Sequence, residues 1–201
     1  MKIVCLDLEG VLVPEIWIEF AEMTGIKELR ATTRDYSDYD ELMKMRLGVL
    51  DKNNLGMNEI QEVISKVEPM PGAKQFLDSI RSKYQLVILS DTYYEFAQTL
   101  MAKLGMPTLF CHQLQIAENG RIENYLLRLA DHKRKSVEAF KALNFKTVAA
   151  GDSYNDTTML KEADTGILFR APDNVIEEFP QFDTATEYDH LESLIDKALG
   201  E

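Results

Sequence analysis

The chain contains little cysteine and histidine: two Cys and three His in 201 residues. Cys5 and Cys111 both lie in apolar, strand-like runs, so we expect buried core residues rather than a disulfide. The histidines, His112, His132 and His190, are dispersed along the sequence, and no Cys/His spacing typical of a zinc site is present. We therefore expect surface or hydrogen-bonded histidines and no zinc site.

Basic residues are outnumbered as well. Lys and Arg together number 22 against 34 Asp and Glu, which gives a formal net charge of -12. Nucleic acids require a basic surface that this composition does not offer, so no nucleic-acid partner is expected. A small anionic substrate stays compatible with this charge where lysines or a metal ion offset it locally.

Long hydrophobic stretches are also missing from the sequence. No signal peptide and no membrane span is visible, and the first apolar run begins almost at Met1. We therefore expect no membrane partner and a cytoplasmic location. A chain of 201 residues suits one domain, or a core with one insertion, and can bury a sizeable apolar interior.

Three apolar runs, at 3–6, 86–89 and 145–150, are typical of buried parallel strands. Each is followed by acids at its carboxyl end, where open α/β sheets bind ligands. These acids are Asp7 and Glu9 after the first run, Asp91 after the second, and Asp152 and Asp156 after the third. The pattern predicts one acidic crevice at the edge where the three strands end.

Residues 14–69 interrupt the strands with helical patterns only. Apolar spacing indicates helices at 15–21 and 39–51 and a third that Asn58 is expected to cap, and Pro14 suits a first helical position. We therefore predict an α/β fold with a doubly wound, mostly parallel, Rossmann-like sheet. Residues 1–13 and 70–201 would form the core domain, and residues 14–69 a small helical cap inserted after the first strand.

Helices and strands alternate through the rest of the chain. Asn119-Gly120 predicts a two-residue hairpin turn between strands at 114–116 and 122–127. Other strands are expected at 85–89, 108–111 and 165–169, and helices at 72–83, 94–104, 133–143, 155–163 and 187–199.

Carboxylates gathered in one crevice repel one another, so at least one would be protonated unless a cation lies among them. Mg²⁺ fits best because it prefers hard oxygen ligands and commonly binds through one or two carboxylates plus phosphate oxygens. The sequence therefore predicts Mg²⁺ as the cofactor.

Four stretches of the sequence resemble, in this order, the motifs of the haloacid dehalogenase-like phosphatases: Asp7-Leu8-Glu9-Gly10-Val11, Ser90-Asp91-Thr92, Lys133, and Gly151-Asp152-Ser153-Tyr154-Asn155-Asp156. The resemblance covers nearly the whole chain. It also implies the helical cap at the place where the helical patterns occur.

The resemblance implies a phosphatase that forms an aspartyl phosphate on Asp7. Asp7, Asp152 and the backbone carbonyl of Glu9 would hold the magnesium ion. Glu9 would protonate the leaving alkoxide and later activate water. Most relatives carry Asp at that position, so Glu9 keeps the carboxylate but adds a methylene.

Ser90 and the adjacent backbone at Asp91 would donate hydrogen bonds to the phosphoryl oxygens and Lys133 would offset their charge, with Asn155 at the edge of the substrate and Asp156 supporting Lys133 or the metal. Two alternatives stay open from the sequence alone. Lys135 lies in the same charge run as Lys133, and Asp91 could be a structural cap.

Glu15 and Arg46 match, by position and surroundings, the family residues that hold the ammonium and carboxylate groups of phosphoserine. Arg30 and Arg34 compete with Arg46, which could also be a surface helix charge, as Glu15 could be a first-turn acid. The closest resemblance is to the bifunctional phosphoserine phosphatase and homoserine phosphotransferase family, which implies a function in serine and threonine biosynthesis.

Two other functions stay open from the sequence. The chain could hydrolyse another small phosphorylated metabolite, or it could be a non-enzymatic module that accepts a phosphoryl group on Asp7. A homodimer is also left open.

Overall fold

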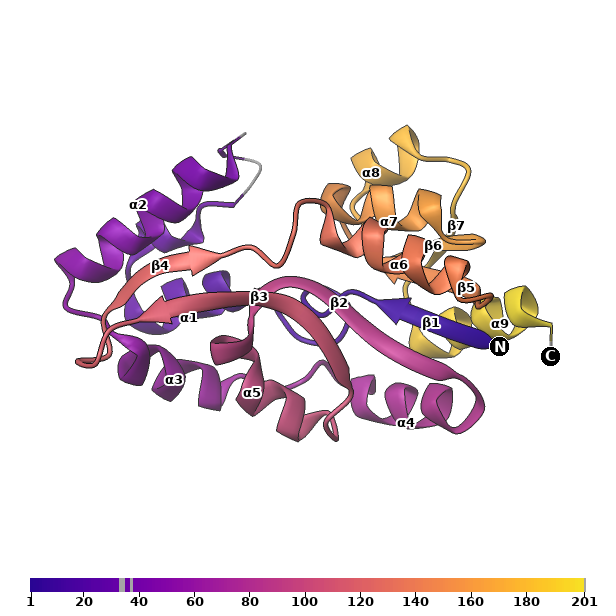
Figure 1. Cartoon of the computed structure of the whole chain (residues 1–201), viewed down its shortest axis with the longest axis horizontal. Helices are drawn as coiled ribbons and strands as arrows, with labels where there is room; N and C mark the ends of the chain where they lie inside the picture. The colour runs from indigo at the N-terminus through magenta and orange to yellow at the C-terminus, as the bar shows by residue number, and fades with distance from the viewer. Residues whose placement is uncertain (33–34, 37, 201) are drawn as a thin grey trace.

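The structure, a computed structural model, describes residues 1–32, 35–36 and 38–200. The described residues form a seven-stranded sheet in the order β4-β3-β2-β1-β5-β6-β7 (Figure 1). Neighbouring strands are parallel except β3 and β4. The strands are β1 Lys2–Leu6, β2 Gln85–Tyr93, β3 Thr108–Ile116, β4 Ile122–Leu126, β5 Lys146–Gly151, β6 Thr165–Phe169 and β7 Asp183–Ala185. The predicted α/β class is confirmed.

Helices cover both faces of the sheet (Figure 1). One face carries α4 Ala73–Lys83, α5 Tyr94–Lys103 and α9 Tyr188–Leu199, and the other carries α6 His132–Ala142, α7 Thr157–Glu162 and α8 Asp173–Glu178. Alternate residues of β1 enter two different cores, with Val4 and Leu6 on one side and Ile3 and Cys5 on the other. Cys5 is therefore a buried, free core residue, as Cys111 is.

The segment between β1 and α4 is helical, as predicted. It contains α1 Ile16–Thr24, the short 3₁₀ helix η1 Lys27–Arg30, α2 Tyr39–Lys52 and α3 Met57–Lys66. Helix α1 packs on η1 and α3, and α3 packs on α5 of the core. The two ends of this helical segment lie side by side, since the backbone N–H of Met70 donates to the carbonyl of Leu12 over 2.9 Å. The division into a core domain and a cap at residues 14 and 69 stays a prediction.

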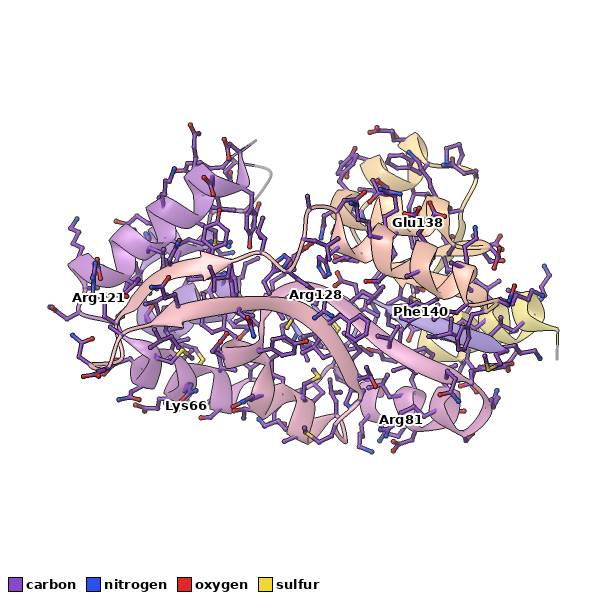
Figure 2. The ribbon with its side chains drawn as sticks, in the orientation of Figure 1. Lys66, Arg81, Arg121, Arg128, Glu138 and Phe140 are labelled. Atoms are coloured by element: carbon purple, nitrogen blue, oxygen red, sulfur yellow. The ribbon has the colours of Figure 1, made fainter. Side chains whose placement is uncertain are left out.

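Strand β3 is longer than the sequence indicated and joins the sheet to a hairpin. Its first half pairs in parallel with β2 and its second half antiparallel with β4, without a break between the expected pieces at 108–111 and 114–116. The hairpin tip, where Gly120 has φ +83°, lies against the helical insertion. Gly120 accepts a backbone hydrogen bond from Met57 over 2.8 Å, and Arg121 holds Asp51 at 2.8 and 2.9 Å (Figure 2).

Several predicted boundaries were wrong for local reasons. Helix α3 begins after Gly56, whose N–H is capped by Glu59 over 2.8 Å, and Asn58 lies inside the helix. Strand β2 continues to Tyr93 instead of ending at residue 89. The helix expected at 155–163 is the 3₁₀ turn η2 Tyr154–Asp156 followed by α7, and the short elements α8 and β7 were not predicted. No helix of the described residues is long and apolar enough to cross a membrane.

Candidate active site

Asp7 lies at the carboxyl end of β1 with its side chain almost fully buried. Its backbone N–H donates to the carbonyl of Ala150 over 2.9 Å, which continues the pairing of β1 with β5 beyond the strand. Its Oδ1 accepts hydrogen bonds from the N–H of Leu8 over 2.7 Å and lies 2.9 Å from Nζ of Lys133. Oδ1 of Asp7 is thereby held by a backbone N–H directly after β1 and by Lys133.

Lys133, in the first turn of α6, is buried among three carboxylates. Its Nζ lies 2.8 Å from Oδ1 of Asp156, 2.9 Å from Asp7 and 3.4 Å from Oδ2 of Asp91. Burial opposes its charge, but the neighbouring carboxylates outweigh burial and raise the pKa of Lys133 well above its usual range. Lys135 is exposed, so Lys133 is the lysine of this charge run that lies at the site.

Asp7, Asp152 and Asp156 form an acidic cluster, with one oxygen of each within 4.8 Å of the others. Oδ2 of Asp156 accepts hydrogen bonds from the backbone N–H groups of Asp152, over 3.0 Å, and Ser153, over 3.2 Å. Burial and the charge of Asp156 raise the pKa of Asp152 to about 7. Burial and the neighbouring carboxylates also raise the pKa of Asp7 well above its usual range.

Two glycines leave the space that these carboxylates fill. A Cβ on Gly10 would collide with the carboxylate of Asp152, and a Cβ on Gly151 would collide with that of Asp156. Gly10 also has φ +74°, a conformation that favours glycine. The three carboxylates are therefore close together, offer only oxygen ligands and repel one another when no cation is present. These properties fit a hard divalent cation such as Mg²⁺.

Glu9 lies two residues after Asp7 and reaches the helical insertion. Its Oε2 accepts a hydrogen bond from the backbone N–H of Ile16 over 2.9 Å, at the start of α1, and the side chain of Thr92 hydrogen-bonds to it. Burial, followed by the charge of Glu15, raises the pKa of Glu9 to about 8. Glu9 is therefore held in place, and its raised pKa favours the protonated form.

Arg46 of α2 is buried, with 7% of its surface exposed. Its Nη2 donates to the carbonyl of Ala31 over 2.8 Å, and its guanidinium lies 4.5 Å from the ring centroid of Trp17. Its Nε is buried without a hydrogen-bond partner among the described residues. Burial lowers its pKa, while Glu9 and Glu15 are near enough to attract its charge.

The other predicted substrate-binding residues surround these groups in different ways. Glu15 precedes α1 and is exposed. Ser90 is buried in β2, where its Oγ accepts from the N–H of Thr92 over 3.3 Å. Asn155 is exposed and donates to Oδ2 of Asp91 over 3.0 Å.

Arg30 and Arg34 were the alternatives to Arg46 as the arginine that binds the substrate carboxylate. Arg30 forms an ion pair with Glu22 at the surface. Arg34 lies outside the described residues. Of Arg30 and Arg46, only Arg46 is buried.

Two histidines that the sequence analysis left without a function meet at Asp91. His112 and His132 are buried, and their Nε2 atoms lie 3.4 and 3.1 Å from the same Oδ1 of Asp91. The expectation of surface or hydrogen-bonded histidines is confirmed for both, because each is buried and hydrogen-bonded. The one available sequence signal was the position of His132 directly before Lys133.

The comparisons with known proteins agree on one family. The family model for haloacid dehalogenase-like hydrolases matches residues 1–164. A phosphoserine phosphatase of Pseudomonas syringae pv. tomato is 60% identical over 198 residues, 98% of this chain and 84% of the relative. The phosphoserine phosphatase ThrH of Pseudomonas aeruginosa is 60% identical over 191 residues, 95% of this chain and 93% of the relative.

Solved structures show the same fold at lower identity. A phospho-aspartyl intermediate analogue of phosphoserine phosphatase matches with a TM-score of 0.78 and 19% identity, covering 96% of this chain and 98% of that chain. A substrate-bound phosphoserine phosphatase complex matches with a TM-score of 0.76 and 20% identity, covering 96% of both chains.

Proposed function

The chain belongs to the haloacid dehalogenase-like hydrolase family, and from this premise we propose that it is a magnesium-dependent phosphoserine phosphatase. The observation that carries the chemistry is the buried group in which Asp7 shares Lys133 with Asp156. The observation that favours the substrate is the 60% identity to two phosphoserine phosphatases over nearly the whole chain.

Asp7 is the proposed nucleophile. Its Oδ1 is held by Leu8 and Lys133, which leaves Oδ2 as the oxygen that attacks phosphorus. The new Oδ2–P bond forms as the bond between phosphorus and the serine oxygen breaks, which gives an aspartyl phosphate. Lys133 offsets negative charge on the phosphoryl oxygens, and Ser90 donates a hydrogen bond to them.

Asp7, Asp152 and the backbone carbonyl of Glu9 are the proposed magnesium ligands, and the raised pKa values of both aspartates support this choice. A bound Mg²⁺ would polarise the phosphoryl group and neutralise charge that develops on it. Asp156 supports the site by accepting from the N–H of Asp152 and pairing with Lys133.

Glu9 is the proposed acid and base. With a pKa of about 8 it carries a proton at neutral pH, which it gives to the departing serine oxygen. The resulting carboxylate then takes a proton from the water that attacks the aspartyl phosphate, which releases phosphate and restores Asp7. The N–H of Ile16 holds Glu9 at the boundary between the core and the helical insertion.

Arg46 and Glu15 are proposed to recognise the amino acid part of phosphoserine. A carboxylate would supply the acceptor that the buried Nε of Arg46 lacks among the described residues. Glu15, exposed at the start of α1, offers a charge opposite to that of an ammonium group. On this proposal residues 14–69 form the cap that selects the substrate.

We also propose homoserine as a second acceptor of the phosphoryl group. Homoserine carries the same ammonium and carboxylate groups as serine on a chain one methylene longer, a difference of about 1–3 kcal/mol in an apolar pocket. The test is to incubate enzyme, phosphoserine and Mg²⁺ with increasing homoserine and to measure phosphohomoserine and free phosphate. If only free phosphate forms at saturating homoserine, the protein is a phosphatase without phosphotransferase activity.

The main test measures phosphate release from a panel of phosphorylated metabolites, with Mg²⁺ or with a chelator. The proposal predicts Mg²⁺-dependent turnover with the highest kcat/KM for phosphoserine. A higher kcat/KM for another metabolite would reassign the substrate. Stoichiometric labelling of Asp7 without turnover would indicate a phosphoacceptor module instead of an enzyme.

A further inference from the structure

We propose that the partly exposed Asp91 and the buried His112 and His132 form a clamp that positions Lys133 and Asn155 for the phosphoryl group, and call these three residues the histidine clamp. This inference rests on the proposed function. It assigns a positioning role to His112 and His132, which neither the motifs nor the family resemblance assigned, and gives Asp91 a positioning role in place of direct substrate binding.

The two carboxylate oxygens of Asp91 contact different groups: Oδ1 contacts the histidines, and Oδ2 contacts Lys133 and Asn155. Oδ1 lies 3.1 Å from Nε2 of His132 and 3.4 Å from Nε2 of His112. Oδ2 lies 3.4 Å from Nζ of Lys133 and accepts from Nδ2 of Asn155 over 3.0 Å. Partial burial opposes ionisation of Asp91, but Lys133 and the two histidines outweigh it and hold its pKa well below the usual range. Asp91 is therefore a carboxylate, which can only accept hydrogen bonds.

The backbone fixes the proton on His112. Its Nδ1 accepts a hydrogen bond from the N–H of Arg128 over 3.1 Å, so that nitrogen carries a lone pair. In the neutral ring the proton is then on Nε2, directed at Asp91. Arg128 belongs to the connection between β4 and α6 (Figure 2), so this connection determines the proton position.

The proton position on His132, in α6, also follows from the contacts of its two ring nitrogens. Its Nε2 faces the ionised Asp91 and must carry a proton to donate. Its Nδ1 is buried without a partner among the described residues, so a proton there would be a buried, unsatisfied donor. Because His132 directly precedes Lys133 at the start of α6, its contact with Asp91 also fixes the backbone that carries Lys133.

The proton positions decide against a metal site at these residues. One ligand atom each of Asp91, His112 and His132 lies within 4.8 Å of the others, which is close enough for a divalent ion. A histidine binds a metal through an unprotonated nitrogen. The Nε2 of His112 carries its proton because Arg128 occupies Nδ1, so the group holds a carboxylate in place rather than a metal ion.

The position of Asp91 affects Lys133 because the Lys133 ammonium can pair with three carboxylates. Asp7 and Asp156 lie closer to Nζ than Asp91 does. An unheld Asp91 could rotate toward Lys133 and draw it away from the position of the phosphoryl oxygens. Displacement of a positioned group by about 1 Å can lower a rate about a hundredfold. The histidines keep Oδ2 of Asp91 at a fixed distance.

The experiment compares three variants with the wild-type enzyme. His132→Leu removes the donor, His132→Gln keeps an amide N–H that can reach Asp91, and His190→Leu changes an exposed histidine on α9 as a matched control. We expect a loss of about tenfold to a hundredfold in kcat/KM for His132→Leu. His132→Gln should recover most of it, and His190→Leu should match the wild type. Urea unfolding of each variant establishes that the folded fraction is the same.

A double-mutant cycle with Asp91→Asn separates positioning from general stability. If His132 acts through Asp91, His132→Leu should lower kcat/KM less than about twofold in the Asp91→Asn background. The inhibition constant of inorganic phosphate should rise equally in both single variants. Independent, multiplicative losses, or a wild-type kcat/KM in His132→Leu, would overturn the clamp.

The measurements are made with both phosphoserine and p-nitrophenyl phosphate. The clamp acts on the phosphoryl end, which every phosphate monoester shares, so its effect should be equal on the two substrates. A wild-type enzyme that hydrolyses only p-nitrophenyl phosphate would contradict the proposed substrate and still test the clamp. If His132→Leu does not fold, the cycle is built from His112→Gln and Asp91→Asn with the same expected outcome.

Discussion

Replacing Asp152 by asparagine should stabilise the metal-free protein at pH 8. The carboxyl of Asp152 is half-buried beside Asp156 and Glu15, which raises its pKa from 3.8 to about 7. An acid whose pKa is higher in the folded state favours folding while it is protonated. That contribution is complete below pH 3.8 and is lost as the pH rises through 7. Above that pH the ionised carboxylate opposes folding.

The magnitude follows from the two pKa values. Each pKa unit corresponds to about 1.4 kcal/mol, so the raised pKa lowers the free energy of unfolding, relative to its value at low pH, by about 4 kcal/mol at pH 8 and about 2 kcal/mol at pH 5.5. Both are upper bounds because water at the half-buried carboxylate screens part of the repulsion. Asp152→Asn removes the charge and nearly preserves the shape, so it should recover much of this free energy.

The assay is urea unfolding at pH 5.5 and pH 8, in chelator and in saturating Mg²⁺. In chelator, Asp152→Asn should be more stable than the wild type, by more at pH 8 than at pH 5.5. In Mg²⁺ the advantage of the variant should shrink by about 2.7 kcal/mol, because a ligand at a hundred times its Kd stabilises the wild type by that amount. Asp183→Asn, at an exposed position on the edge strand β7, is the control. A variant less stable than wild type in chelator at pH 8 would refute the reasoning.

Three further predictions address turnover. Asp7→Asn should lower kcat at least about a thousandfold, or about 4 kcal/mol, with the fold intact by circular dichroism; higher residual activity would exclude Asp7 as nucleophile. Arg46→Ala should lower kcat/KM about tenfold to a hundredfold for phosphoserine and far less for p-nitrophenyl phosphate, because only phosphoserine has a carboxylate; equal losses would assign Arg46 to the fold. Because the pKa of Glu9 is about 8, kcat/KM should fall above that pH as the general acid loses its proton, and a profile level to about pH 10 would contradict this.

The acidic edge of the sheet could be predicted from the sequence because topology determines it. Parallel strands end at one edge, so acids that follow separate apolar runs must meet there. The contacts of Lys133 with Asp7 and Asp91, and the grouping of Asp7 with Asp152, follow from this rule and from the first turn of α6.

The histidine clamp could not be predicted in the same way. His112 lies where β3 changes partner from β2 to β4, and the strand continues through that point without a turn signal. Its proton position depends on the N–H of Arg128, a backbone group that every residue except proline provides. Residue type therefore carries no signal for the contact, and only the three-dimensional structure reveals it.

The position of Arg46 did carry a signal that composition hides. The helical stripe of α2 contains the buried residues Leu42, Met43 and Leu50, and Arg46 falls on the same face at spacings of three and four residues. A solvated charge would occupy the opposite face. The spacing places Arg46 on the buried face, although a surface helix charge had stayed open from the sequence, and the spacing does not identify the groups around it.

The two buried cations of the site are compensated to different extents, and this difference supports a division of labour. Lys133 pairs with Asp7, Asp91 and Asp156, so its charge is balanced by the protein itself. Arg46 contacts the ring of Trp17, the carbonyl of Ala31 and Sδ of Met43, and its Nε has no partner among the described residues. The charges of Glu9 and Glu15 compensate it from nearby. A buried charge that is only partly compensated is unfavourable, so an arriving carboxylate gains more at Arg46 than at an exposed arginine. We therefore expect the phosphoryl end to determine the rate and the Arg46 end to determine which phosphate ester is chosen.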